Sequence, residues 1–251
     1  MEGYRANTYG DRIADVYDSW HSFPDETEAA TDLLATLAGD GPALELAIGT
    51  GRIALPLAER GVAVHGIDAS KAMLSRLRRK PGGKRIPVTL GDFAEVGVDG
   101  RFRLVYLVFN TIFALLTQDD QLRCFRNVAA HLTDDGVFLV EAFVPDLARF
   151  ERDQSTSVSH IDVDKIMLDV SRHNPATQTI DSQHVLVGAD GIRLQPVRLR
   201  YAWPSELDLM AQLAGLRLRD RWAGWRGEPF TAAATSHVSV YEFRDPPATD
   251  Q

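Results

Sequence analysis

The sequence has one cysteine, Cys124, in 251 residues, and no apolar run long enough to span a bilayer, so we expect no membrane partner. A single cysteine excludes an internal disulfide and, with no signal-peptide pattern at the amino terminus, favours the reducing cytoplasm. The seven histidines show no metal-ligand spacing, which predicts no metal site. The net charge of −8 argues against nucleic acid as a partner, because phosphate backbones repel an acidic protein.

The hydrophobic content of 45% and charged content of 25% are those of an ordinary globular protein. A chain of 251 residues can bury one sizeable core and still carry a lid or an insertion. With nucleic acid and membrane disfavoured, the expected partner is a small molecule. The number of subunits stays open, and a homo-oligomer is among the options.

Helical spacing of apolar residues predicts one helix from Tyr9 to Trp20 and a second from about 26 to 37, ended by a Gly-Asp-Gly-Pro breaker. Short apolar segments then alternate with helical ones, and strands separated by helices predict a parallel sheet with right-handed crossovers. Ser70 is a good N-cap for one of these helices. The expected strands cover residues 43–48, 62–67, 86–90, 104–109 and 137–143.

After Pro145 the pattern changes to three antiparallel strands at 165–174, 177–188 and 192–203. A helix from Pro204 and two last strands, 216–222 and 238–243, complete the chain. The predicted fold class is therefore α/β: a seven-strand, mostly parallel, doubly wound sheet with an antiparallel β insertion and an N-terminal helical lid. The predicted parts are the lid, 1–40, the α/β domain, 41–146 with 204–244, and the insertion, 147–203.

Ligands of an open parallel sheet bind outside the carboxyl ends of its strands. The first strand contains Glu45 and runs into a turn with two glycines, which allow close approach of a ligand. The second strand ends at Asp68, whose carboxylate can accept two hydrogen bonds from ribose hydroxyls. The third is followed by Asp92-Phe93, an acceptor for an adenine amine beside an aromatic face, and the fourth by Phe109-Asn110.

The segment ALELAIGTGRIALPLAERGVAVHGIDAS resembles the cofactor-binding motif of the class I S-adenosylmethionine-dependent methyltransferases, which have a Rossmann-like fold, and the likeness covers about residues 42–143. The resemblance implies S-adenosylmethionine as cofactor and S-adenosylhomocysteine as product. It places Glu45 near the methionyl amine, Asp68 on the ribose and Met73 near the adenine. The cofactor-binding residues expected in this way are Tyr17, Glu45, Ala47, Gly49, Gly51, Arg52, Asp68, Ala69, Met73, Asp92, Phe93, Phe109 and Asn110.

One position departs from this family, which usually has glycine where Ala47 stands, and the extra methyl group could narrow the pocket. The spacing Gly49-x-Gly51-x-x-Ala54, with Asp68 nineteen positions after Gly49, also fits a dinucleotide-binding fingerprint. The position of Glu45 within its strand, Gly-Asp after the third strand and the closing antiparallel pair favour the methyltransferase.

Aromatic residues crowd the predicted lid, where Val16 and Trp20 are expected to pack on the domain. Tyr9 and Tyr17 are expected to line the active site, because a hydroxyl can orient an amine and a ring face can stabilise a sulfonium cation. Phe113, beside the end of the fourth strand, is the third candidate catalytic residue, with core packing as its alternative.

Methyl transfer to a neutral amine needs positioning more than a dedicated base, whereas an alcohol or phenol usually needs a histidine. The acceptor is expected to enter between the amino-terminal helix, the loop after the fourth strand and the insertion. His21 and His160 are the candidates near this entrance, and both are typical of ordinary surface residues. The sequence therefore predicts N-methylation of a small secondary metabolite by proximity and desolvation. This layout is similar to antibiotic-tailoring N-methyltransferases of actinomycetes. An O-methyltransferase and a non-catalytic cofactor-binding module are the alternatives.

Overall fold

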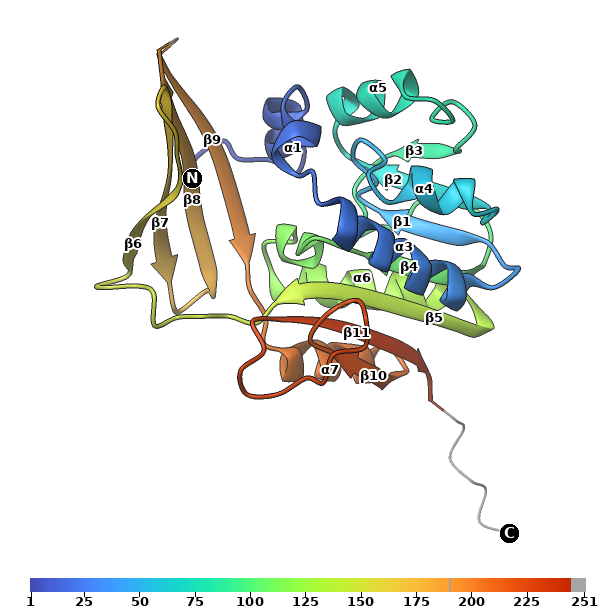
Figure 1. The fold of residues 1–251 in the computed structure, drawn as a ribbon. Helices are drawn as coiled ribbons and strands as arrows, with labels where there is room; N and C mark the ends of the chain where they lie inside the picture. The colour runs from blue at the N-terminus through green and yellow to red at the C-terminus, as the bar shows by residue number, and fades with distance from the viewer. Residues whose placement is uncertain (190, 245–251) are drawn as a thin grey trace.

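The computed structural model describes residues 1–189 and 191–244, and the strands in these ranges form two separate sheets (Figure 1). The larger sheet has seven strands in the order β10-β11-β5-β4-β1-β2-β3. Strands β1 to β5 pair in parallel, while β11 is antiparallel to β5 and to β10. The bounds are β1 Ala43–Leu46, β2 Val64–Asp68, β3 Val88–Leu90, β4 Phe102–Leu107, β5 Leu132–Phe143, β10 Leu216–Trp222 and β11 Ser236–Phe243.

Helices cover both faces of this sheet, which confirms the predicted doubly wound arrangement. Buried residues of α3, α4 and α5 form a core cluster on one face, and those of α6 and α7 form a cluster on the other. Ser70 caps α5 as predicted, by accepting a hydrogen bond from the backbone of Met73. The helices are α3 Pro24–Ala38, α4 Ala54–Glu59, α5 Lys71–Arg79, α6 Gln118–His131 and α7 Pro204–Leu213, with a short 3₁₀ helix, η1, at Thr111–Ala114.

Residues 1–23, which precede α3, are called the lid below. They contain two short helices, α1 Thr8–Ile13 and α2 Tyr17–Trp20, so the prediction of one continuous helix was wrong. The two helices bind different loops of the α/β domain. Ser70, after β2, donates a hydrogen bond to Asp11 of α1, and Thr50, after β1, donates one to Asp18 of α2. The break between the helices lets the lid reach both loops.

The insertion has four antiparallel strands where three were predicted, in the order β6-β7-β8-β9. The missed strand is β6, Gln154–Ile161, which pairs with β7. Its sequence, QSTSVSHI, is serine-rich and lacks the apolar alternation that marks a half-buried strand, and it forms by backbone pairing at the edge of the sheet. The other strands are β7 Lys165–Asn174, β8 Thr179–Gly188 and β9 Gly191–Arg200, which ends before the predicted residue 203.

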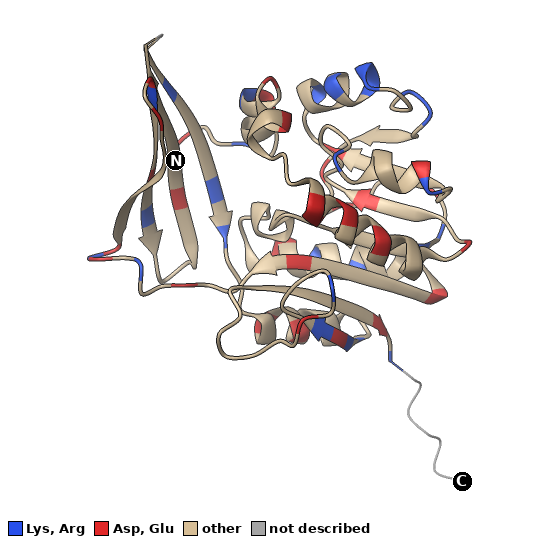
Figure 2. Cartoon of the chain, viewed as in Figure 1, with Lys and Arg blue, Asp and Glu red and all other residues tan. Residues whose placement is uncertain are grey.

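The insertion sheet stands beside the lid, with β9 as the strand next to α1 (Figure 1). All its strands lie within 147–203, and those of the larger sheet lie within 41–146 and 204–244. The three-part division of the chain stays a prediction. Acidic residues gather on α3 and basic residues on α5, the helices that flank the lid (Figure 2). Within the described ranges, no helix has the length and apolar character needed to cross a membrane.

Candidate active site

The turn after β1, residues 47–51, is called the cofactor turn here, and its backbone is left-handed at three positions. The φ angles are 58° at Ala47, 57° at Gly49 and 79° at Gly51. A Cβ added to Gly51 would lie 2.4 Å from Leu77 Cδ1, so a side chain does not fit there without movement. Ala47 stands where the family usually has glycine, and its positive φ explains that preference, because only glycine adopts this conformation without steric cost.

Asp68 lies at the carboxyl end of β2 with 8% of its surface exposed. Its two carboxylate oxygens accept backbone hydrogen bonds from Gly49, at 2.8 Å, and from Ser70, at 2.7 Å. Burial raises the pKa of Asp68, while these two bonds oppose the shift. A carboxylate has about four lone-pair sites, so Asp68 can still accept the two hydroxyls of a ribose.

Glu45 of β1 is buried beside the same turn, with 3% of its surface exposed. The hydroxyl of Tyr106 donates to Glu45 Oε2 at 3.0 Å, and burial raises the pKa of Glu45 to about 8. The positive charge of Arg52 opposes this shift. Arg52 Nε is itself buried, without a hydrogen-bond partner among the described residues. A buried carboxyl group and a half-buried guanidinium thus lie near the same turn, and these are the two kinds of group that bind the amine and the carboxylate of an amino acid.

The loop after β4 is strained at two consecutive residues, Phe109 with φ of 58° and Asn110 with φ of 62°. Glu141 of β5 holds this loop, because its carboxylate accepts a hydrogen bond from the backbone of Phe109. The side chain of Asn110 in turn accepts one from the backbone of Phe143 at 2.6 Å. Strain of this kind persists only where the surroundings fix it, and such sites cluster at functional regions.

Four aromatic side chains meet where the lid covers the cofactor turn, and we call them the lid cluster: Tyr9, Tyr17, His21 and Phe109. The His21 ring lies 4.6 Å from the Tyr17 ring and 4.8 Å from the Phe109 ring, between centroids. The Tyr9 hydroxyl is 3.2 Å from His21 Nε2, and Arg52 lies over the Phe109 ring at 5.1 Å. Burial, followed by the charge of Arg52, lowers the pKa of His21 to about 4, so this imidazole is neutral at pH 7.

Two hydrogen bonds hold the lid against the loops that carry the predicted cofactor-binding residues. Thr50 Oγ1, fully buried, donates to Asp18 at 2.6 Å, and Ser70 Oγ donates to Asp11 at 2.6 Å. Lys80 adds an ion pair to Asp18 at 2.8 Å. The structure therefore has the lid closed over the cofactor turn.

The other predicted residues are spread more widely. Asp92 is exposed and accepts a hydrogen bond from the backbone of Ala94, while its neighbour Phe93 is 8% exposed and packs in the core. Met73 is buried against the lid, and Ala69 is half-buried after Asp68. Phe113 does not join the lid cluster, because it is fully buried and packs on Phe143 at 4.8 Å. His160 is exposed on β6.

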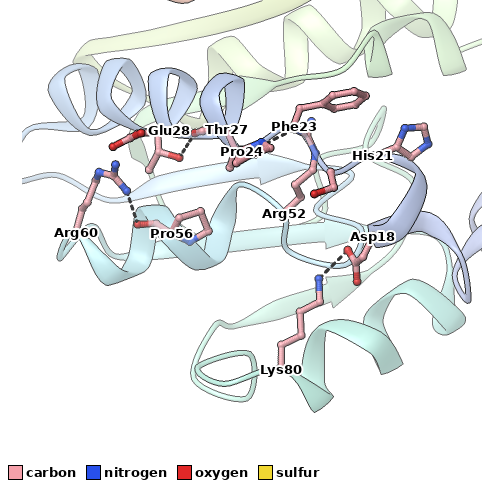
Figure 3. Close-up of a pocket in the computed structure, with 12 residues that line it drawn as sticks. Asp18, His21, Phe23, Pro24, Thr27, Glu28, Arg52, Pro56, Arg60 and Lys80 are labelled. Atoms are coloured by element: carbon pink, nitrogen blue, oxygen red, sulfur yellow. Dashed lines mark hydrogen bonds and ion pairs between the residues drawn. The ribbon is translucent and has the colours of Figure 1, made fainter.

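A cavity of about 530 Å³ lies beside the lid, between α2, α3 and α4 (Figure 3). Arg52 and His21 border it on the side of the lid cluster, and Lys80 pairs with Asp18 at its edge. The acceptor was expected to enter between the lid, the loop after β4 and the insertion. This cavity lies elsewhere, because its lining comes from the lid, α3, the first turns of α4 and the end of α5.

Sequence reasoning missed three residues that shape the site: Asp18, Thr50 and Glu141. Thr50 lies inside the glycine motif, and this position is a sequence signal from which a role in the site could have been predicted. Asp18 and Glu141 carry no comparable signal, because each acts on a partner 32 residues away in the chain. Only strand order and lid placement bring these partners together.

The comparisons with known proteins agree with this geometry. The family model described as "Methyltransferase domain" matches residues 43–136. The solved structure of the CcbJ methyltransferase from Streptomyces caelestis is 40% identical, with a TM-score of 0.91, over 96% of this chain and 100% of that one.

Two further relatives are similar over shorter stretches. The cypemycin N-terminal methyltransferase from Streptomyces sp is 29% identical over 202 residues, covering 79% of this chain and 82% of that protein. The dTDP-3-amino-3,6-dideoxy-alpha-D-glucopyranose N,N-dimethyltransferase from Streptomyces fradiae is 31% identical over 139 residues, 53% of this chain and 54% of that protein.

The likeness to the CcbJ methyltransferase extends over the lid and the insertion as well as the α/β domain. It agrees with the glycine motif and the buried acid at the end of β2, and it decides against the dinucleotide-binding alternative. The predicted family and fold class are confirmed. The chain belongs to the class I S-adenosylmethionine-dependent methyltransferases.

Proposed function

We propose that this enzyme methylates an amine nitrogen of a small secondary metabolite, such as an antibiotic intermediate. The observation that carries the proposal is the lid cluster beside the cofactor turn, in which the His21 ring packs between those of Tyr17 and Phe109 with centroid distances of 4.6 and 4.8 Å. Aromatic faces stabilise sulfonium and ammonium cations alike. The names of the two relatives given above, an N-terminal methyltransferase and an N,N-dimethyltransferase of an amino sugar, both specify methylation of nitrogen, which supports the same conclusion.

The residues of the site fit S-adenosylmethionine, which supplies an electrophilic methyl group on a positively charged sulfur. Asp68 has free lone pairs for the ribose hydroxyls after its two backbone bonds. Glu45 is placed for the methionyl amine, and the unpartnered Nε of Arg52 suits the methionyl carboxylate. Met73 would lie near the adenine. The remaining proposed contacts are the turn residues Ala47, Gly49 and Gly51, the adenine-side residues Ala69, Asp92 and Phe93, and Tyr17, Phe109 and Asn110 on the lid side.

For the acceptor, we assign Tyr9 and Tyr17 to orientation. The Tyr9 hydroxyl, bonded to His21, is a polar group on an otherwise aromatic surface. Phe113 would act through Phe143, against which it packs, and not by touching the acceptor. Positioning of this kind can contribute several kcal/mol to a displacement reaction, by holding the nitrogen about 3–3.5 Å from the methyl carbon.

A turnover assay tests the proposal and its alternatives. The enzyme and S-adenosylmethionine are incubated with amino sugars, peptides that have a free N-terminus, and phenols, and methylated products are detected by mass spectrometry. Methylation of amines alone supports the proposal. Methylation of phenols alone would make the chain an O-methyltransferase. Binding of S-adenosylhomocysteine without any turnover would favour a non-catalytic cofactor-binding module.

We also propose that the enzyme is cytoplasmic and forms a homo-oligomer. The oligomer is supported by apolar residues on the outer face of the insertion sheet, where Val158, Val170 and Leu194 are 54%, 41% and 52% exposed. Exposed apolar patches of this kind are typical of interaction sites. Light scattering coupled to size exclusion would give the subunit number, and Val158→Lys with Leu194→Lys should lower it.

A further inference from the structure

A carboxylate–histidine pair lies on the inner face of the insertion sheet. Asp169 of β7 and His184 of β8 are direct cross-strand partners, and Gln195 of β9 continues the same row. The His184 Nδ1 atom is hydrogen bonded to the Asp169 carboxylate, and the two side chains are 34% and 31% exposed. Because cross-strand partners project to the same side, all three side chains share one face.

This face turns toward the α/β domain and the lid. Four residues before His184 on the same face is Ile180, which is 3% exposed and belongs to the core of the α/β domain. Helix α1 of the lid packs against β9. His184 is also close enough to His21 of the lid cluster for its charge to lower the pKa of that imidazole. The row therefore lies on the face that joins the core of the α/β domain, with His184 near the lid cluster.

Gln195 adds a hydrogen-bond acceptor to this row, and Gln183, on the opposite face of β8, also has a buried Oε1 atom without a partner among the described residues. Gln195 is 6% exposed, yet its Oε1 atom is buried without a hydrogen-bond partner among the described residues. Leaving a buried polar atom unpaired costs about 1–3 kcal/mol, and a donor on a bound molecule would remove that cost. An amine with N–H or neighbouring O–H groups is such a donor.

The hydrogen bond to Asp169 decides which nitrogen of His184 is free. With Nδ1–H donating to the carboxylate, Nε2 has an unshared electron pair and can accept a proton. An alkyl amine has a pKa near that of lysine, about 10.4, so at pH 7 it arrives as an ammonium ion without a lone pair. Methyl transfer to nitrogen therefore requires that the acceptor first lose a proton.

We propose that His184, oriented by Asp169, takes the proton from the acceptor's ammonium group while Gln195 accepts a hydrogen bond from the same molecule. This inference rests on the proposed function. The N–H bond of the ammonium breaks, its proton passes to Nε2, and its electron pair remains on nitrogen for bond formation with the methyl carbon. The imidazolium is stabilised by Asp169 and later returns its proton to solvent.

The groups around His184 set the pH range of this step. Asp169 lies beside it on β7, and His21, bonded to Tyr9, faces it from the lid. Arg193 and His160 lie on the same face, one row further from the α/β domain. Asp169 is the acidic partner in contact with the ring.

The test compares His184→Gln and His184→Ala with wild type, using the amine of the panel that wild type methylates fastest. At pH 7, kcat/KM should fall roughly a hundredfold, and the loss should shrink toward pH 10, where the free amine exists in solution. Affinity for S-adenosylhomocysteine should stay within about twofold. Gln183→Ala is the matched control, because Gln183 is the adjacent residue on the opposite face of β8 and should leave the pH profile unchanged.

A second measurement needs no variant that turns over. In the wild-type complex with S-adenosylhomocysteine, the His184 imidazole is followed by NMR, with its signal assigned by its absence in His184→Gln. Saturation with the same amine at pH 8 should move the His184 ring signals, because Nε2 accepts a hydrogen bond from the bound ammonium group, and unmoved signals would overturn the inference. Equal pH profiles for wild type and His184→Gln would also overturn it while leaving N-methylation intact. Turnover of phenols alone would remove both proposals.

Discussion

The hydroxyl of Thr50 in the cofactor turn donates a 2.6 Å hydrogen bond to the carboxylate of Asp18 in the lid. Thr50 is fully buried, whereas Asp18 is partly exposed and also pairs with Lys80. This contact connects the lid with the turn that we propose to bind the cofactor. Closure of the lid and order of the turn should therefore change together.

Replacing Asp18 with alanine should loosen the lid. The variant loses the bonds to Thr50 and Lys80, and because Asp18 is partly exposed, solvent screening limits the effect to roughly fivefold in affinity for S-adenosylhomocysteine. Most of the change should lie in a faster dissociation rate, measured by stopped-flow fluorescence. Ser19→Ala, at the exposed neighbouring position, is the control. Equal dissociation rates for Asp18→Ala and Ser19→Ala would contradict the proposed link.

Replacing Asp68 with alanine should weaken cofactor binding directly. Hydrogen bonds to a charged group contribute about 1.5–3 kcal/mol each, so the dissociation constant should rise at least about tenfold. Calorimetry with S-adenosylmethionine gives the constant, and circular dichroism confirms that the variant is folded. Unchanged affinity in a folded Asp68→Ala protein would show that Asp68 does not bind the ribose.

Replacing Ala47 with glycine should stabilise the protein. A left-handed conformation costs a residue with a side chain about 1–2 kcal/mol, and the added freedom of glycine in the unfolded chain returns about 0.5–1 kcal/mol of this. The expected net gain, up to about 1 kcal/mol, corresponds to roughly 2–4 °C in Tm. Ala43→Gly, in the regular part of the same strand, should lower Tm. A lower Tm for Ala47→Gly would mean that the methyl group makes contacts that outweigh the strain.

The cofactor-free protein should lose stability as pH rises, because the pKa of Glu45 is raised to about 8. An exposed glutamate has a pKa of about 4.3, so between these values the folded protein holds a proton that the unfolded chain has released. The contribution of Glu45 is present in full at low pH and is lost as pH rises through 8, with a slope of at most about 1.4 kcal/mol per pH unit. Urea titrations from pH 5 to 8 should show that the free energy of unfolding depends less on pH in Glu45→Gln than in the wild type. Parallel curves for the two proteins would contradict the shift.

Removing the hydroxyl of either lid tyrosine should slow transfer more than it weakens cofactor binding. Tyr9→Phe removes the hydroxyl that is hydrogen bonded to His21, and Tyr17→Phe removes a polar group next to Arg52. A misplaced acceptor can cost roughly ten- to a hundredfold in kcat. Single-turnover kinetics measure this step, with calorimetry for the cofactor. If both variants keep full activity while His21→Ala is inactive, His21 is the essential group and the hydroxyl-acceptor alternative gains support.

The order of strands and the place of Asp68 could be predicted because they depend on local patterns. Each strand of the larger sheet is a short apolar run between clear breakers, and the carboxyl ends of parallel strands always meet at one edge. The glycine motif predicts the position of the cofactor turn for the same reason. The departure at Ala47 from the family's usual glycine is visible in the sequence, whereas its φ of 58° is set by the folded turn.

Contacts set by register and by tertiary bonds could not be read from the sequence. Glu141 reaches Phe109 because β5 lies beside β4 and the intervening loop turns left-handed. His184 meets Asp169 through the register of β7 and β8, and a shift of one residue would place them on opposite faces. The lid breaks into two helices because Ser70 and Thr50 bind it from different loops. The sequence of the lid itself does not indicate this break.

The consecutive left-handed residues Phe109 and Asn110 create a conflict between thermal stability and catalytic activity in this enzyme. A bulky residue with positive φ costs of order 1–3 kcal/mol, a large fraction of the margin that keeps a protein folded. Laboratory evolution for heat resistance alone should therefore favour glycine at position 109. That change would relax the loop and also delete the ring that faces His21 and Arg52. Lineages selected for survival at high temperature and lineages selected for turnover should diverge at this one codon.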